Sequence, residues 1–384
     1  MYQGTAVVLL ILALTRQGKP SSETSQQYRG PKRCRSWTKQ PDLLGGSVLG
    51  EIHIFETLDV RCEKGAKAKG SPVIGELRDG SPVSLPVRIV HGAQDGPILS
   101  LTGVIHGDEP NGLAAINRIC DELDPAQLRG IVVAFPLSSP FAYITKSRIS
   151  ELDYERLNQN RVFPGNAEGL ITERVASAIF EEGIRKANYH IDFHEGGYDF
   201  IARYLIAQSP EDDSRLAEEN LHLARAFGLG IPVNIVKISP QARTLGRAGT
   251  TTVQANQLGI PSLCNELGGA GRVWPEHVET AITGTLNVMK DLGMLTGEKV
   301  EVATPQLIGT DSKWPRPTRG GWWEQVVELG QVVAEGEKVG HVRNAFGEII
   351  EELHAPHRAV IFDIRNTAAI MTGEWTVNCG KLLR

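Results

Sequence analysis

Two histidines and one glutamate have the residue types and the spacing of a catalytic metal site. His106 and Glu109 stand three residues apart directly after an apolar run, and His194 ends a second apolar run much later in the chain. A catalytic zinc ion takes about three imidazole or carboxylate ligands and keeps an open position for water. A single histidine at a strand end is more often a hydrogen-bonded polar group than a ligand. The combination of all three residues therefore predicts one zinc ion per chain.

The segments that must position these ligands alternate between strands and helices. Residues 98–105 and 189–193 are rich in apolar and β-branched residues and predict strands, and Pro110 opens a segment of helical period that reaches residue 123. Such alternation is typical of an α/β domain, here expected to be a mixed sheet with helices on both faces. Because open α/β sheets bind ligands beyond the carboxyl ends of their strands, we expect the three ligands at one edge.

A glutamate at the end of a later strand is the candidate general base. Further strands are predicted at 131–137, 233–238 and 261–265, and further helices at 170–186, 215–227 and 276–292. Glu266 directly follows the last of these strands and is expected at the same edge, although an exposed glutamate without a role is the alternative. Glu195 is its main rival. Neighbouring side chains of a strand point to opposite faces, so Glu195 is expected to point away from the metal unless a turn at Gly196 intervenes.

The last eighty residues follow a different pattern. After about residue 305 the helical period disappears, and short glycine-punctuated strands are predicted at 321–327, 332–333, 338–343, 348–353 and 359–364. We therefore expect three parts: an irregular N-terminal extension (1–46), a catalytic α/β domain (47–304) and a small all-β, barrel-like module (305–384). The module resembles a biotinyl or lipoyl carrier, but no lysine stands at the expected hairpin tip, so a structural role is predicted.

Composition and charge restrict the partners and the compartment. The net charge of −5 offers no basic field for nucleic acid or anionic lipid, and five scattered cysteines without C-x-x-C spacing argue against a disulfide framework. Cysteine usage favours the cytoplasm. The apolar run at residues 5–14 is too short to span a bilayer but long enough for a signal h-region, so export is the alternative. No nucleic acid and no membrane partner are expected, and a homo-oligomer is compatible with the sequence.

Four motifs occur together in one order: GVIHGDE at 103–109, NRVFPG at 160–165, IDFH at 191–194 and NELGG at 265–269. In this combination the sequence resembles the succinylglutamate desuccinylase/aspartoacylase family of zinc carboxypeptidase-like hydrolases, over roughly residues 87–269. The resemblance implies a zinc-carboxypeptidase-like fold and zinc on His106, Glu109 and His194. It also implies that Glu266 is the general base, which takes a proton from the metal-bound water and later protonates the leaving amine.

The same resemblance suggests residues that contact the substrate. Arg148 is the candidate that stabilises the developing oxyanion, at a longer spacing than in the family, and Asn160 with Arg161 resembles a clamp for a substrate carboxylate. A surface salt bridge is the alternative for Arg161. One departure stands out: the family's Asp-Leu-Asn-Arg is Asn158-Gln159-Asn160-Arg161 here. If residue 158 stands behind a ligating histidine, a neutral Asn158 would weaken metal binding, and Asn158→Asp would tighten it.

These features favour a zinc-dependent hydrolase that cleaves the amide bond of a small N-acylated amino acid or related compound. Two alternatives stay open. A metallocarboxypeptidase acting on peptides would use the same zinc, base and arginine clamp. A non-catalytic binding protein could retain the scaffold after its site has decayed, which the Asn158 departure would suggest. The acyl group, the leaving amine and the oligomeric state depend on loop geometry that one sequence does not fix.

Overall fold

The structure is a computed structural model that describes residues 52–151, 155–239 and 248–383. The predicted N-terminal extension (1–46), with the apolar run at 5–14, lies outside the described residues. The account below concerns the compact unit that begins at residue 51. No helix among its described residues is long and apolar enough to cross a membrane.

One mixed twelve-stranded sheet organises the described chain. Its order is β15-β18-β20-β13-β11-β10-β12-β9-β7-β8-β6-β3. The bounds are β3 Ala66–Gly70, β6 Val87–His91, β7 Gln94–Gly103, β8 Arg129–Phe135, β9 Tyr189–His194, β10 Phe200–Pro210, β11 Val233–Ile238, β12 Ser262–Gly269, β13 Ile308–Lys313, β15 Val332–Val333, β18 Ala359–Arg365 and β20 Asn378–Leu382. Strands β8, β7, β9 and β12 are parallel neighbours, and β10 runs antiparallel to β12.

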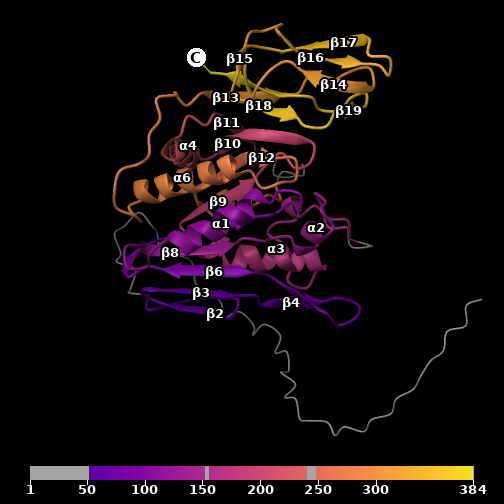
Figure 1. Ribbon diagram of the computed structural model, residues 1–384. Coiled ribbons are helices and arrows are strands. Elements are labelled where there is room, and N and C mark those ends of the chain that lie inside the picture. Colours follow the sequence, from indigo (N-terminus) through magenta and orange to yellow (C-terminus); the bar gives the residue numbers. More distant parts are fainter. Residues whose placement is uncertain (1–51, 152–154, 240–247, 384) are drawn as a thin grey trace, which may run out of the picture. The chain divides into compact units, whose positions relative to one another are not determined.

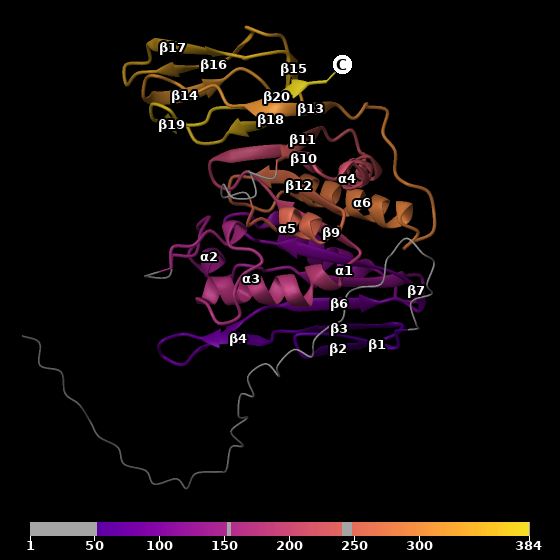
Figure 2. The same cartoon turned by 180° about the vertical axis from the view of Figure 1, so that it is seen from behind.

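Helices pack on both faces of this sheet (Figures 1 and 2). They are α1 Asn111–Glu122, α2 Pro140–Ile144, α3 Ile171–Glu182, α4 Ser214–Phe227, α5 Thr251–Gln257 and α6 Pro275–Asp291, with 3₁₀ turns η1 Gln159–Arg161 and η2 Ile184–Lys186. Helices α1, α4 and α6 bury apolar residues against one face, together with Ile191 and Phe193 of β9. Helices α3 and α5 pack on the opposite face. Because side chains alternate along β9, its even-numbered residues point toward α5.

The described strands after residue 305 divide between two sheets. Strands β13, β15, β18 and β20 extend the twelve-stranded sheet, because β13 pairs with β11 and β18 pairs with β10. A four-stranded sheet contains β17 Ile349–His354, β16 Lys338–Arg343, β14 Gly321–Gln325 and β19 Ala369–Ile370. The described residues of this part contain strands and no helix. The division of the chain at residue 305 stays a prediction, although these strand pairs cross it.

Two short hairpins and the cysteines complete the description. β1 Ile54–Thr57 pairs with β2 Val60–Glu63, and β4 Val73–Glu76 pairs with β5 Pro82–Ser84. The cysteines within the described residues are free and buried, namely Cys62, Cys120, Cys264 and Cys379. Burial raises the pKa of the Cys120 and Cys379 thiols to about 12, so these side chains act as small apolar residues.

Candidate metal centre and active site

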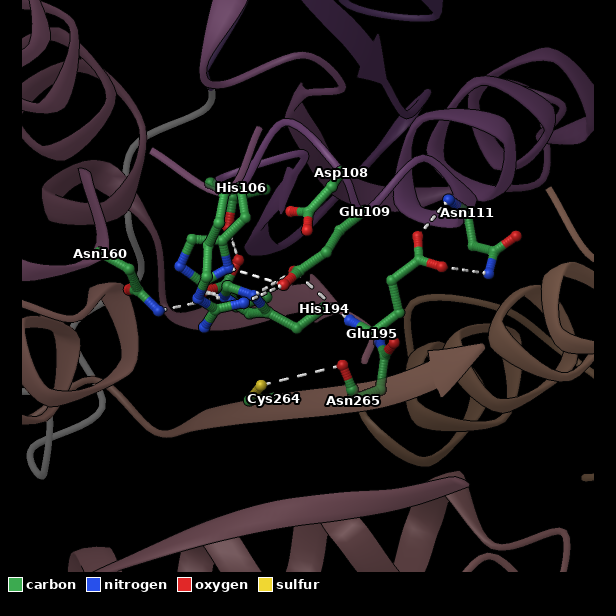
Figure 3. A network of polar contacts seen from close by, with 12 residues as sticks. His106, Asp108, Glu109, Asn111, Asn160, His194, Glu195, Cys264 and Asn265 are labelled. Atoms are coloured by element: carbon green, nitrogen blue, oxygen red, sulfur yellow. Dashed lines mark hydrogen bonds and ion pairs between the residues drawn. The ribbon is translucent and has the colours of Figure 1, made fainter. Parts of the chain in front are cut away.

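The three predicted ligands meet at the carboxyl ends of β7 and β9. The Nδ1 atom of His106 lies 2.8 Å from Oε1 of Glu109, and Nδ1 of His194 lies 2.7 Å from Oε2 of the same carboxylate (Figure 3). One ligand atom from each of the three residues lies within 4.8 Å of the others, and all three side chains are buried. Two imidazole nitrogens facing one carboxylate form a donor set that fits zinc.

The backbone around His106 is shaped by close packing. Val104, which follows β7, has a φ of +53°, a conformation that is costly for a β-branched residue and typical of functional sites. Gly107 is required by the packing of this loop. A Cβ at residue 107 would lie 1.9 Å from the carbonyl carbon of Ala142, so α2 can lie against the ligand loop only when residue 107 is glycine.

Burial and neighbouring charges shift the pKa values of the three groups. Burial lowers the pKa of His106 to about 4, although Glu109 opposes this effect. Burial also disfavours the charged form of His194, but the carboxylates of Asp192 and Glu109 outweigh it and raise the pKa of His194 well above its ordinary value. Burial likewise disfavours the Glu109 carboxylate, but the two histidines outweigh it and lower its pKa well below the ordinary value.

Asp192 orients His194 from behind. Its Oδ2 lies 3.0 Å from Nε2 of His194, and it accepts hydrogen bonds from the hydroxyls of Thr102, at 2.6 Å, and Thr251. A carboxylate behind a ligating histidine fixes the ring and raises its basicity. Sequence reasoning missed this residue, although a signal was present: Asp192 stands two residues before His194 in one strand, so both side chains point to the same face.

Asn158 does not stand behind a ligating histidine, so that prediction is wrong. Its Oδ1 accepts a hydrogen bond from the backbone N–H of Asn160 at 2.9 Å, which caps the η1 turn. The carboxylate that orients a ligand is Asp192, on β9. The neutral residue at position 158 therefore gives no reason to expect weak metal binding or a decayed site.

Glu266 lies beside His194 in the sheet. The two residues are Cα partners on the parallel strands β9 and β12, so their side chains share a face. Glu266 lies within β12, rather than just after the strand as predicted, and is half-buried. Burial raises the pKa of its carboxyl well above the ordinary value; His194 opposes this rise, and nearby carboxylates add to it.

Glu195 points away from the metal ligands, as expected from strand alternation. Its Oε1 accepts the backbone N–H of Asn111 at 2.6 Å, and its Oε2 accepts the Asn111 side-chain amide at 2.8 Å (Figure 3). Asn111 is the first residue of α1, where backbone N–H groups lack helical partners and favour a negative charge. Glu195 therefore serves the helix N-terminus and is a poor candidate for the base.

The structure brings Arg148 and Asn160 to the ligands but leaves Arg161 at the periphery. Nη1 of Arg148 donates to Oε1 of Glu109 at 2.8 Å, and the arginine side chain is half exposed. Nδ2 of Asn160 lies 3.4 Å from Nε2 of His194, and its buried Oδ1 has no hydrogen-bond partner. Arg161 is exposed, and its Nη1 donates to the Asn160 carbonyl at 2.6 Å.

Residues 95–292 match the model of the succinylglutamate desuccinylase/aspartoacylase catalytic domain. The chain belongs to this family. A curated relative, the N-alpha-acetyl-L-2,4-diaminobutyric acid deacetylase of Halomonas elongata, is 27% identical over 274 residues, which are 71% of this chain and 77% of the relative.

Solved structures share the fold. A succinylglutamate desuccinylase from Silicibacter sp. TM1040 has a TM-score of 0.73 at 23% identity, covering 83% of this chain and 95% of that one. The product-bound ectoine utilization protein EutE (DoeB) from Ruegeria pomeroyi has a TM-score of 0.72 at 24% identity, covering 82% and 94%. At these identities the similarity establishes the fold, and the roles of individual side chains must be argued from their own contacts.

Proposed function

We propose that the chain is a zinc-dependent deacylase that hydrolyses the amide bond of a small N-acylated amino acid or a related compound. The observation that supports this most is the convergence of two histidine Nδ1 atoms on the buried Glu109 carboxylate, beside Glu266, in a member of this family. The deacetylase relative supports the substrate class. His106, Glu109 and His194 would hold the zinc ion.

When bound, zinc supplies a Lewis acid that polarises the substrate carbonyl and lowers the pKa of water. In the proposed reaction Glu266 accepts a proton from the attacking water as the new carbon–oxygen bond forms. It then returns that proton to the leaving nitrogen as the carbon–nitrogen bond breaks, which yields a carboxylic acid and an amine. The position of Glu266 on the same face of the sheet as His194, directly opposite it, suits both transfers.

Arg148, Asn160 and Arg161 would bind the substrate. The Arg148 guanidinium reaches Glu109 and is therefore within reach of an oxyanion that develops next to the ligands. Asn160 turns its amide toward His194 and keeps an unpartnered oxygen inside the site. Arg161, beside it, offers the planar fork that binds a carboxylate bidentately, as a free amino acid would require.

The decisive experiment measures bound zinc and then turnover of N-acetyl and N-succinyl amino acids, N-alpha-acetyl-2,4-diaminobutyrate and short peptides. We expect one zinc ion per chain and hydrolysis of acyl amino acids. Glu266→Gln should retain zinc but lose roughly 10²- to 10⁴-fold in kcat, the usual contribution of a general acid–base group. Glu335→Gln, which changes an exposed glutamate, is the matched control and should behave as wild type.

Three results would point elsewhere. Faster turnover of peptides than of acyl amino acids would indicate a metallocarboxypeptidase. Zinc binding with an unchanged rate in Glu266→Gln would remove the proposed base. Absence of both zinc and turnover would leave a non-catalytic binding protein.

A further inference from the structure

The loop that carries Arg148 has no regular structure of its own. None of the described residues between α2 and η1 belongs to a helix or a strand. Nη1 of Arg148 donates to Oε1 of Glu109 at 2.8 Å, so its place beside the metal ligands depends on how the rest of the fold holds this loop. Such a loop needs anchors, because a small displacement of a group that acts in the transition state lowers the rate strongly.

One anchor lies directly before Arg148, at Ser147. The backbone N–H of Gly107, in the loop of the metal ligands, donates to the Ser147 carbonyl at 3.0 Å. The backbone N–H of Ser147 donates in turn to the Ala142 carbonyl at 2.9 Å. The Ser147 hydroxyl donates to the carbonyl of Ile149 at 2.6 Å. This side of Arg148 is therefore tied to the ligand loop and to α2.

The second anchor lies two residues after Arg148, at Ser150. This serine is 2% exposed, and its backbone N–H donates to the Leu157 carbonyl at 3.1 Å. Its hydroxyl donates to Oε2 of Glu155 at 3.4 Å. The Glu155 carboxylate therefore contacts the chain two residues after Arg148.

The same carboxylate reaches helix α3. Its Oε1 accepts the backbone N–H of Ile171 at 2.8 Å, and its Oε2 accepts the hydroxyl of Thr172 at 2.6 Å. These are the first two residues of α3, where backbone N–H groups lack helical partners and a negative charge is favoured. Glu155 is 6% exposed, and its three hydrogen bonds offset the cost of burying a carboxylate.

The contact with Ser150 sets Glu155 apart from an ordinary helix cap. The N-terminus of α3 has a cap within its own sequence, because Glu173 accepts the backbone N–H of Leu170 at 2.8 Å. Glu155 comes from a separate loop and bonds Ser150 with the same oxygen that bonds Thr172. It therefore connects the loop of Arg148 to a helix whose apolar face packs on the sheet.

We propose that Glu155 is a positioning residue for Arg148: it fixes the loop against the N-terminus of α3 and so holds the guanidinium beside Glu109. This inference rests on the proposed function, because it concerns the side chain proposed to stabilise the oxyanion. The anchor at Ser147 is formed largely by backbone groups. The anchor at Ser150 depends in part on the Glu155 side chain, which a substitution can remove.

Three single variants test this in the zinc-loaded full-length chain, with kcat, KM, bound zinc and melting temperature measured for each. Glu155→Ala should lower kcat by roughly tenfold, a part of the roughly 10²- to 10³-fold that an oxyanion donor contributes, with KM changed by less than about twofold and zinc retained. Glu155→Gln should keep most of kcat, because its oxygen can accept from Ile171 and both hydroxyls can rotate to accept from its NH₂ group. Glu173→Ala is the matched control. It removes an acceptor from the same end of α3, and it should lower the melting temperature without changing kcat.

A background without the Arg148 guanidinium separates positioning from general damage. In Arg148→Gln, the further change Glu155→Ala should alter the residual rate by less than about twofold, because the group that Glu155 positions is gone. An unchanged kcat in Glu155→Ala, or an equal tenfold loss in the Arg148→Gln background, would overturn the inference and leave Glu155 as a cap of α3. An unchanged kcat in Arg148→Gln would overturn it as well, and none of these results contradicts the proposed amide hydrolysis. If the wild-type chain hydrolyses none of the acyl amino acids, the proposed function fails and this inference fails with it.

Discussion

Replacing Asp192 with asparagine should weaken zinc binding without touching a ligand. Oδ1 of Asp192 accepts from Thr102, and Oδ2 faces both the Thr251 hydroxyl and Nε2 of His194. An asparagine that keeps its oxygen toward Thr102 turns an NH₂ group toward the other two. The Thr251 hydroxyl can rotate to accept from this group, but the His194 N–H cannot. One hydrogen bond to a charged group is lost, which is worth about 1.5–3 kcal/mol.

That loss sets the size of the expected effect. About 2 kcal/mol corresponds to roughly thirtyfold in an equilibrium constant, within the tenfold to hundredfold range typical of partners behind a ligating histidine. Zinc affinity would be measured by competition with a chelator at constant pH. The matched control is Asp291→Asn, which removes the carboxylate from His222, a histidine whose side chain is 62% exposed, and should leave zinc affinity unchanged.

Equal zinc affinity in Asp192→Asn and wild type would refute the argument that Asp192 tunes His194. A comparable loss in Asp291→Asn would show that the assay reports general destabilisation instead. Melting temperatures of the zinc-free proteins measure the destabilisation of each variant separately from its zinc affinity.

Three further predictions follow from single contacts. Asn158→Asp should keep the bond to the Asn160 N–H and change zinc affinity by less than about threefold in the chelator assay, because residue 158 touches neither histidine. Gly107→Ala should lower the melting temperature, at a cost of about 1–3 kcal/mol or more, because its Cβ would overlap the Ala142 carbonyl. Burial raises the pKa of Asp363 to about 7, so the folded chain holds a proton that the unfolded chain releases near pH 4. Stability should therefore fall as pH rises from about 4 to about 7, by up to about 4 kcal/mol, and urea unfolding at pH 5 and pH 8 should show this fall in wild type but not in Asp363→Asn.

Helices and strands with a regular spacing of apolar residues could be predicted from the sequence. The helices α1, α4 and α6 and the strand β11 occur within two residues of their expected bounds. In each of these segments the regular spacing of apolar residues is long enough to identify a helix or a strand without tertiary information. The edge-of-sheet argument also placed His106, Glu109 and His194 together, because it needs only the carboxyl ends of strands and no knowledge of loops.

The strands that were missed or misplaced depend on pairing with segments that are far away in the sequence. Strand β10 was not predicted, although it lies between β11 and β12 and provides the partner of Glu266. The end of β12 was predicted at residue 265, but the strand continues to Gly269. Gly268 and Gly269 continue the strand with positive φ values of +102° and +147°, where a Cβ would strike Asn111 and the Phe200 carbonyl. Local sequence propensity does not reflect such tertiary contacts.

Strand β10 pairs with a strand from beyond residue 305, and glycine punctuation of the sequence does not reveal such pairing. One edge of β10 pairs with β12, and the other pairs with β11 along its second half and with β18 at its start. Without β18, the first residues of β10 would present unpaired backbone groups at the end of the strand that supports Glu266. The same short pairing places Asp363 opposite Ala202. The pairing with β18 therefore covers the part of this edge of β10 that β11 leaves open.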